Sequence, residues 1–292
     1  MLSHGDEPLI GAALESLLAQ DVPLEIVLSH SGGGSTPQRV AATFPGVRIV
    51  AAPSRRLPGA ARNAGVAATT APFVAFLAAD CVAKPGWAAA RVARHTNGAA
   101  AVASAMAPPA TLAPALASHL LQHWSRMPHR TPRPPQRFGV SYARSLLEAF
   151  GGFREDLAIA EDAELNARIL AAGVAIEWAP DVRIEHAYPR TLAALTADAF
   201  ARSRRRAAVG GRPARRLALA ARALAAFAAG AAMVLAPGSP VARRRLVAAL
   251  PLLALGALAG CAGALIGAPP EPGALAELRF HRFARTHARG GG

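Results

Sequence analysis

Residues 73–80 read Phe-Val-Ala-Phe-Leu-Ala-Ala-Asp, an apolar run that ends in a carboxylate. A short run of this kind is typical of a buried strand, so we predict a strand over residues 73–78. Two similar runs precede it, at residues 24–29 and 47–51. Helices are predicted before and between these strands, at residues 7–20, 37–44 and 59–68. The alternation predicts an α/β domain with a mostly parallel central sheet, whose ligands bind beyond the carboxyl ends of the strands.

The chain after residue 100 continues this pattern. An amphipathic stretch over residues 112–124 lies within a proline-rich region, residues 107–136. Further elements are predicted, with glycines ending the helices: a strand at 138–143, a helix at 144–150 before Gly151-Gly152, a helix at 162–172 before Gly173, and strands at 176–178 and 182–185. The globular domain is therefore expected to span residues 1–200.

Charge and hydropathy change after residue 190. Residues 1–190 carry 17 basic and 15 acidic side chains, a net charge of +2, whereas residues 191–292 carry 15 and 3, a net charge of +12. With 52% hydrophobic residues and a mean hydropathy of +0.26, the chain is too apolar for a disordered protein. Its basic residues border apolar runs without interleaved aromatic side chains, which favours an anionic membrane surface over nucleic acid as a partner.

The segments after the globular domain differ in character. They are a basic juxtamembrane segment at 201–216, two apolar helices within 217–268, and a basic tail at 269–292. The run at 246–268 is uncharged and long enough to span a bilayer, whereas the Ala-rich run at 217–236 is interrupted by Arg222. Three arrangements stay open: spanning helices, a re-entrant or interfacial hairpin, and a soluble helical pair packed on the core.

Cys81 and Cys261 are far apart in the sequence and predict neither a disulfide framework nor a zinc site. Asp6 and Glu7 stand where a signal peptide has its basic and apolar regions, so secretion is not indicated. We therefore expect the globular domain at the cytoplasmic face of the inner membrane.

Several motifs occur in a fixed order along residues 5–190. They are Leu14-Glu15-Ser16-Leu17-Leu18-Ala19-Gln20, Arg62-Asn63-Ala64-Gly65, the run 73–80, Gly151-Gly152-Phe153-Arg154-Glu155-Asp156-Leu157, Glu161-Asp162-Ala163-Glu164-Leu165, Arg168, Gly173, Pro180 and His186. In this order and spacing the chain resembles family 2 of the glycosyltransferases, which are inverting enzymes with the GT-A fold. The resemblance implies a GT-A domain that binds a nucleotide-diphosphate sugar, followed here by an apolar helical hairpin.

The resemblance implies that Asp80 binds Mg²⁺ or Mn²⁺, since hard cations prefer oxygen ligands and commonly share the phosphates of a substrate. The family pattern is Asp-x-Asp, but Ala78 takes the first place here and Cys81 stands where another acid is common. Without the resemblance, Asp80 could equally cap a turn. His186 stands where related enzymes can have a histidine facing the diphosphate or metal, although a lone histidine is more often structural.

The Glu161-Asp162 pair stands at the start of a predicted helix, where an aspartate is ordinarily an N-cap. The resemblance implies that Asp162 is the general base that deprotonates the acceptor hydroxyl. It leaves Glu161 to orient the site or the acceptor.

Donor binding is expected at other helix and strand ends. Arg62 and Asn63 lie in a helix that begins near Pro58-Gly59, where backbone N–H groups and a guanidinium could meet a diphosphate; a surface ion pair is the alternative. His30 or Ser31 stands where the family has an aspartate that holds the nucleobase or ribose, and either side chain can hydrogen-bond a base edge.

The start of the chain departs from the family, which opens with a strand before the segment that Ser3–Glu7 resembles. Only Met1-Leu2 stand in that place. We therefore expect a truncated first strand and a reading frame that begins upstream.

Together these residues predict a membrane-associated inverting glycosyltransferase. It would move a sugar from a nucleotide-diphosphate sugar to an acceptor hydroxyl on a lipid-linked or cell-envelope glycan. Ala78, Cys81 and the missing acid near His30 favour an alternative, a non-catalytic relative that acts as a membrane-bound sugar-nucleotide or glycan-binding subunit.

Overall fold

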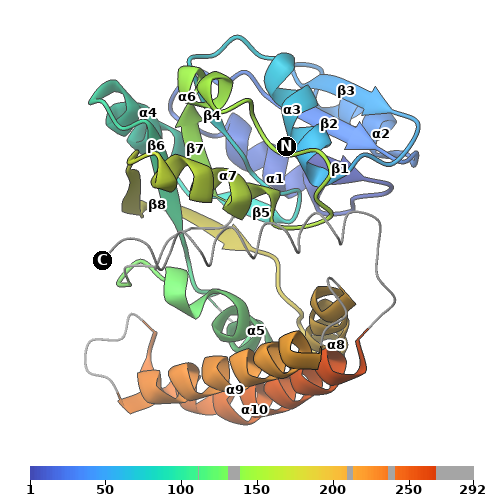
Figure 1. Cartoon of the computed structure of the whole chain (residues 1–292), viewed down its shortest axis with the longest axis vertical. Helices are drawn as coiled ribbons and strands as arrows, with labels where there is room; N and C mark the ends of the chain where they lie inside the picture. Colours follow the sequence, from blue (N-terminus) through green and yellow to red (C-terminus); the bar gives the residue numbers. More distant parts are fainter. Residues whose placement is uncertain (111, 131–138, 209–212, 236–240, 268–292) are drawn as a thin grey trace. The chain divides into compact units, whose positions relative to one another are not determined.

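The computed structural model describes residues 1–110, 112–130, 139–208, 213–235 and 241–267 (Figure 1). The described chain divides into two compact units. The first comprises residues 1–105 and 139–185, and the second comprises the described parts of 106–130 and 186–267. Residues 209–212 of the predicted basic juxtamembrane segment and the predicted basic tail at 269–292 lie outside the described residues.

The first unit alternates strands and helices along most of its length. Its elements are β1 (Leu2–His4), α1 (Ile10–Leu18), β2 (Val27–Ser31), α2 (Thr36–Thr43), β3 (Arg48–Ala52), α3 (Pro58–Ala67), β4 (Phe73–Ala75), β5 (Cys81–Ala83), α4 (Trp87–Thr96), β6 (Ala101–Met106), β7 (Val140–Ala143), α6 (Arg144–Ala149), α7 (Glu161–Ala171) and β8 (Ile176–His186). β6 and β8 each end one residue inside the second unit.

A three-stranded sheet of order β1-β2-β3 confirms the predicted parallel arrangement. β2 is buried at all five positions, as expected of a central strand. β1 is short, but it is present and pairs with β2 from Leu2 to His4. Leu2 also forms a parallel bridge with Ala78. The carboxyl ends of β1 and β2 and the turn that follows Ala78 therefore lie at one edge.

The second sheet adds antiparallel pairs to the predicted α/β fold, so the strands are not all parallel. Its order is β4-β7-β6-β8-β5, and β7 pairs antiparallel with both β4 and β6. An apolar run reports that a segment is a buried strand but not the direction of its neighbours, so this mixture was not visible in the sequence. The two strands predicted at 176–178 and 182–185 form the single strand β8, which continues through Pro180.

Helix faces and helix ends follow the sequence closely. In α1, Ile10, Ala13, Leu14 and Leu17 are buried, which is the spacing of one apolar face. α3 begins with Pro58, a residue suited to the first helical turn. α6 and α7 are followed by glycines with positive φ, namely Gly151, Gly152 and Gly173. No pattern predicted α4 or β6.

The second unit is helical in its described residues. It contains α5 (Ala113–His123), the short 3₁₀ turn η1 (Trp124–Arg126), α8 (Leu192–Ala208), α9 (Pro213–Leu235) and α10 (Arg243–Ile266). Figure 1 shows α9 and α10 side by side, and α10 also packs on α5 and α8. Its core is formed by buried apolar residues of all four helices, including Leu116, Leu120, Leu195, Met233, Leu246 and Leu253.

Glycines of α10 allow α8 to approach closely. A β-carbon on Gly263 would lie 2.2 Å from the carbonyl oxygen of Phe200, and one on Gly260 would lie 3.3 Å from Ser203 Oγ. Farther along the same contact, Arg204 Nε donates to the carbonyl oxygen of Gly267 at 2.8 Å, beyond the end of α10. α8 therefore covers one whole side of the carboxyl-terminal half of α10.

Both α9 and α10 are long and apolar enough to cross a membrane by length and composition, with mean hydropathies of 1.9 and 2.1 over Pro213–Val234 and Arg243–Ile266. Within the most apolar stretch of α10, 39% is buried inside the protein, whereas the corresponding share for α9 is 17%. α10 is thus partly a core helix of this unit.

We predict that Gly263→Val destabilises the helical unit by about 1–3 kcal/mol, because its new atoms meet the backbone of α8, which cannot move aside without unpacking the helix. The matched control is Ala262→Val on the neighbouring exposed position. Thermal unfolding of both variants in detergent, followed by circular dichroism, measures the difference. Equal melting temperatures would show that α8 and α10 are not packed in this way.

Candidate active site

The edge of the first sheet is closed by two loops that bind each other. The backbone N–H of Gly5 donates to the carbonyl oxygen of Ser31 at 3.2 Å, and Thr36 Oγ1 donates to the carbonyl oxygen of Gly5 at 2.9 Å. The Asp6 carboxylate accepts hydrogen bonds from the N–H and the hydroxyl of Ser35, both at 2.7 Å. These contacts fix the segment after β1 against the glycine-rich loop after β2.

His30, predicted to hold the nucleobase, is buried at this edge and bonded at both ring nitrogens. Its Nε2 lies 2.6 Å from the carbonyl oxygen of Gly33 and its Nδ1 lies 2.8 Å from Ser3 Oγ. A neutral ring with the proton on Nε2 satisfies both contacts, donating to Gly33 and accepting from Ser3. Ser31 is also buried. In this structure His30 therefore shapes the loop through Gly33.

Asp80, the predicted metal ligand, is half-buried in the turn that leads into β5. The N–H of Cys81 closes this turn on the carbonyl oxygen of Ala78 at 3.1 Å, and Cys81 Sγ lies 3.6 Å from Asp80 Oδ1. One carboxylate beside a thiol is a sparse donor set for a hard cation. It fits Mg²⁺ or Mn²⁺ that takes most of its ligands from water and from the phosphates of a substrate.

Arg62 and Glu161 form a buried ion pair between α3 and the start of α7. Arg62 Nε lies 2.8 Å from Glu161 Oε1, and the two side chains are only 12% and 6% exposed. The guanidinium also lies 5.0 Å from the ring centroid of Phe76 and 5.3 Å from that of Phe153. Arg62 was predicted to meet the donor diphosphate, with an ion pair as the alternative, and here it pairs with the carboxylate beside Asp162. Its role at the diphosphate stays a prediction.

The electrostatics of this pair reflect its burial. Burial raises the pKa of the Glu161 carboxyl, and the Arg62 guanidinium opposes this shift. Burial alone would lower the pKa of Arg62, but Glu161 and Asp162 outweigh it, so the pKa of Arg62 is raised. Arg62 therefore stays charged and lies within electrostatic range of both carboxylates.

Asp162, the predicted base, is buried in the first turn of α7. Its Oδ1 accepts a hydrogen bond from the N–H of Ala163 at 2.7 Å, which orients the carboxylate. Ala160, just before the helix, has φ of 68° and so occupies the left-handed region, which costs about 1–2 kcal/mol for a residue with a β-carbon. Strained backbone at this place is typical of functional sites.

Asn63 fastens the loop before α7 to α3. Its Oδ1 accepts from the N–H of Phe153 at 2.9 Å, and its Nδ2 donates to the carbonyl oxygen of Phe153 and to Glu155 Oε1, both at 2.8 Å. The predicted role of Asn63 in donor binding stays a prediction. The observed contacts make it a clamp on the loop that leads to Glu161.

His186, the second predicted metal ligand, is the last residue of β8 and belongs to the second unit. Within that unit, the centroid of its ring lies 5.7 Å from the centroid of the His123 ring and 4.8 Å from that of the Tyr188 ring. Tyr188 OH in turn lies 2.8 Å from His119 Nδ1. The role of His186 at a metal stays a prediction.

An apolar cavity of about 330 Å³ lies next to the amino ends of β1 and β2, and Arg62 and Phe76 of the cluster around Glu161 are among its lining residues. Its lining includes Met1, residues 24–27 and residues 71–77. Donor sites of parallel sheets lie at the opposite, carboxyl ends of the strands. We therefore do not assign this cavity to the donor.

Comparisons with known proteins agree with this arrangement. Residues 1–144 match the family model described as glycosyl transferase family 2. These residues are a glycosyltransferase family 2 domain.

The similar proteins are also glycosyltransferases. The pre-mycofactocin glycosyltransferase of Mycobacterium tuberculosis is 28% identical over 153 residues, a match to 48% of this chain and 32% of the relative. The chain thus spans about a third of the length of the curated relatives it matches.

Two solved structures share the GT-A fold. The mannosyltransferase PcManGT of Pyrobaculum calidifontis, in complex with GDP-Man and Mn²⁺, matches with a TM-score of 0.50 and 22% identity, over 98% of this chain and 82% of that one. S. aureus TarS in complex with UDP matches with a TM-score of 0.52 and 16% identity, over 90% and 87%. At these identities the likeness shows the fold alone.

Some contacts around the candidate site were missed by sequence reasoning. Asp6 and Thr36 hold the glycine-rich loop after β2, and their positions, just after a strand and at a helix start, were the available signal. Arg168 donates to both oxygens of Glu164 and to the carbonyl oxygens of Phe150 and Gly152. The pairing with Glu164 follows from the i,i+4 spacing on α7, whereas nothing local in the sequence indicates the contacts with Phe150 and Gly152.

We predict that Gly59→Ala disturbs the site while Gly65→Ala, on the same helix, does not. A β-carbon on Gly59 would lie 1.9 Å from the carbonyl oxygen of Arg154, so the loop clamped by Asn63 must shift, at a cost of about 1–3 kcal/mol. A β-carbon on Gly65 meets only Ser29 Cβ, at 3.6 Å. Thermal unfolding of both variants tests this, and a Gly59→Ala protein as stable as the wild type would refute the packing.

Proposed function

We propose that this chain is an inverting glycosyltransferase that acts at a membrane. It moves a sugar from a nucleotide-diphosphate sugar to a hydroxyl of a lipid-linked or cell-envelope glycan. One observation carries this proposal. The buried Arg62, which lies within the residues matched by the family model, forms an ion pair with Glu161. This contact joins the carboxylates Glu161 and Asp162, which lie outside the matched residues, to the matched domain.

In the proposed reaction, Asp162 accepts the proton of the acceptor hydroxyl while the hydroxyl oxygen attacks the anomeric carbon. The bond from that carbon to the diphosphate breaks on the opposite face, which inverts the configuration. Glu161, held by Arg62, positions the start of α7 and with it the Asp162 carboxylate. A Mg²⁺ or Mn²⁺ ion held by Asp80 would neutralise charge on the leaving diphosphate.

The helical unit supports the membrane part of the proposal. α9 and α10 expose large apolar side chains, including Leu217, Leu224, Leu255, Leu258 and Ile266. Arginines stand at the starts of both helices, at positions 215 and 216 in the first turn of α9 and 243 to 245 in the first turn of α10. Apolar faces bordered by basic residues suit the cytoplasmic leaflet of the inner membrane, whose surface is anionic.

Replacing the proposed base should abolish transfer without unfolding the protein. Asp162→Asn keeps the shape and the hydrogen bond from Ala163 but cannot accept a proton, so we expect kcat to fall by about 10²–10⁴-fold. Asp181→Asn, an exposed carboxylate on β8 paired with Arg94, is the control. Sugar transfer and nucleotide binding are measured on each purified variant. Undiminished transfer by Asp162→Asn would exclude it as the base.

Metal removal should affect donor binding through Asp80. UDP, GDP, dTDP and CDP are each added with and without Mn²⁺, because a ligand that binds the native state raises the melting temperature. We expect a metal-dependent rise with one nucleotide for the wild type and for Asp181→Asn, and its loss in Asp80→Asn. If none of the four nucleotides raised the melting temperature, with or without Mn²⁺, the result would instead support a non-catalytic subunit.

A further inference from the structure

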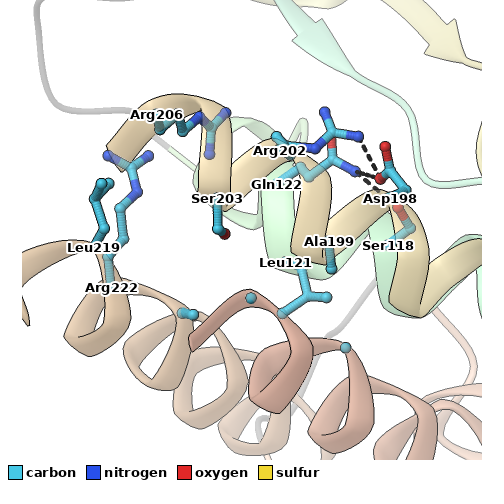
Figure 2. A pocket seen from close by; sticks show the side chains of 13 residues that line it. Ser118, Leu121, Gln122, Asp198, Ala199, Arg202, Ser203, Arg206, Leu219 and Arg222 are labelled. Carbon is cyan, nitrogen blue, oxygen red and sulfur yellow. Dashed lines mark hydrogen bonds and ion pairs between the residues drawn. The ribbon is translucent and has the colours of Figure 1, made fainter. Parts of the chain in front are cut away.

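The helical unit contains a small pocket of about 50 Å³ that is rich in arginine (Figure 2). Its walls come from α5, α8, α9 and α10. The charged residues in the lining are Arg202 and Arg206 of α8, Arg222 of α9, and Asp198 of α8. The described lining therefore holds three guanidinium groups and one carboxylate.

The single acid of the lining is already engaged. Asp198 Oδ2 is ion-paired with Arg202, and Gln122 Nε2 lies 3.5 Å from the same oxygen. Figure 2 shows this group on one side of the pocket and the side chains of Arg206 and Arg222, with Leu219, on the other. Arg202 Nε is buried without a hydrogen-bond partner, so a donor in this wall is unsatisfied.

The position of Arg222 strengthens the case for an anionic ligand. It lies within α9, whose residues 217–235 are otherwise uncharged. Ionisable residues within apolar helices are costly, and they commonly mark binding sites or ion pathways. Gly256 and Gly260 of α10 form the floor of the pocket, where side chains would fill the space.

We propose that this pocket binds the phosphate of an anionic lipid headgroup, with Arg206 and Arg222 as its main ligands. Guanidinium groups bind phosphate through paired N–H donors, and basic pockets between apolar helices suit lipid headgroups. The volume admits one ionic group, while the acyl chains lie against the exposed apolar side chains of α9, such as Leu217 and Leu224. This site rests on the proposed membrane association and is independent of the proposed glycosyl transfer.

The test uses the full chain in neutral detergent, with Arg206→Gln/Arg222→Gln as the variant. Arg205→Gln/Arg244→Gln is the matched control, because it removes the same charge from exposed positions of α8 and α10. Three additives are titrated while thermal unfolding is recorded: dioctanoyl phosphatidic acid, dioctanoyl glycerol and inorganic phosphate. They separate the phosphate from the acyl chains.

We expect phosphatidic acid to raise the melting temperature of the wild type and of the control, with an affinity at least about tenfold weaker in Arg206→Gln/Arg222→Gln. Equal affinity in that variant would overturn the proposal. It would also fail if dioctanoyl glycerol produced the full rise, or if inorganic phosphate did so and thereby identified the free ion as the ligand.

Folding and glycosyl transfer are checked separately. Nucleotide binding is measured on the same samples, so a failure of donor binding is distinguishable from a failure of the lipid site. If the glutamine variant does not fold, Arg206→Lys/Arg222→Lys retains the charge but loses the paired donors. We then expect severalfold weaker binding of phosphatidic acid than in the control, and unchanged binding would overturn the assignment of these arginines.

Discussion

The buried ion pair of Arg62 and Glu161 is the contact on which the candidate active site depends. It joins helices 99 residues apart in the sequence, and both charges have been removed from water. Removing one partner of such a pair costs about 3–5 kcal/mol, since the remaining charge stays buried. The faces of Phe76 and Phe153 enclose the guanidinium and contribute cation–π attraction. The start of α7, and so Asp162, is thereby held by the same helix that carries Asn63.

A second set of contacts makes this support rigid. The side-chain amide of Asn63 accepts from the N–H of Phe153 and donates to its carbonyl oxygen. This pair of hydrogen bonds resembles the pairing between neighbouring strands and fixes the loop before α7. Gly59 permits the close approach of that loop to α3, and Ala160 absorbs the sharp change of direction into α7. The proposed role of Asp162 as base would need such support, because small misplacements of a reacting group reduce the rate steeply.

The sequence was most informative where structure depends on local pattern. The strand β3, the helices α1 to α3 and the glycine ends of α6 and α7 were all predicted close to their observed bounds, whereas β2 begins at Val27 rather than at the predicted residue 24. β6, with the sequence Ala-Val-Ala-Ser-Ala-Met, has one β-branched residue, so only its complete burial makes it a strand. The partners of Arg62, Asn63 and His30 were not predictable either, because each bond joins segments brought together by the fold.

The packing of α8 on α10 restricts how the helical unit can meet a membrane. Because α8 lies along Gly260 and Gly263, any insertion of α10 into the bilayer core takes α8 with it. That would bring Asp198 and the arginines of α8 into hydrocarbon, at about 2.5–3.5 kcal/mol or more for each charge at the centre. Apart from Leu192 at the start of α8, the exposed large apolar residues of this unit lie, by contrast, on α9 and α10. An interfacial arrangement, with these faces in the lipid and α8 at headgroup level, satisfies both constraints and places the arginine pocket where phosphates are found.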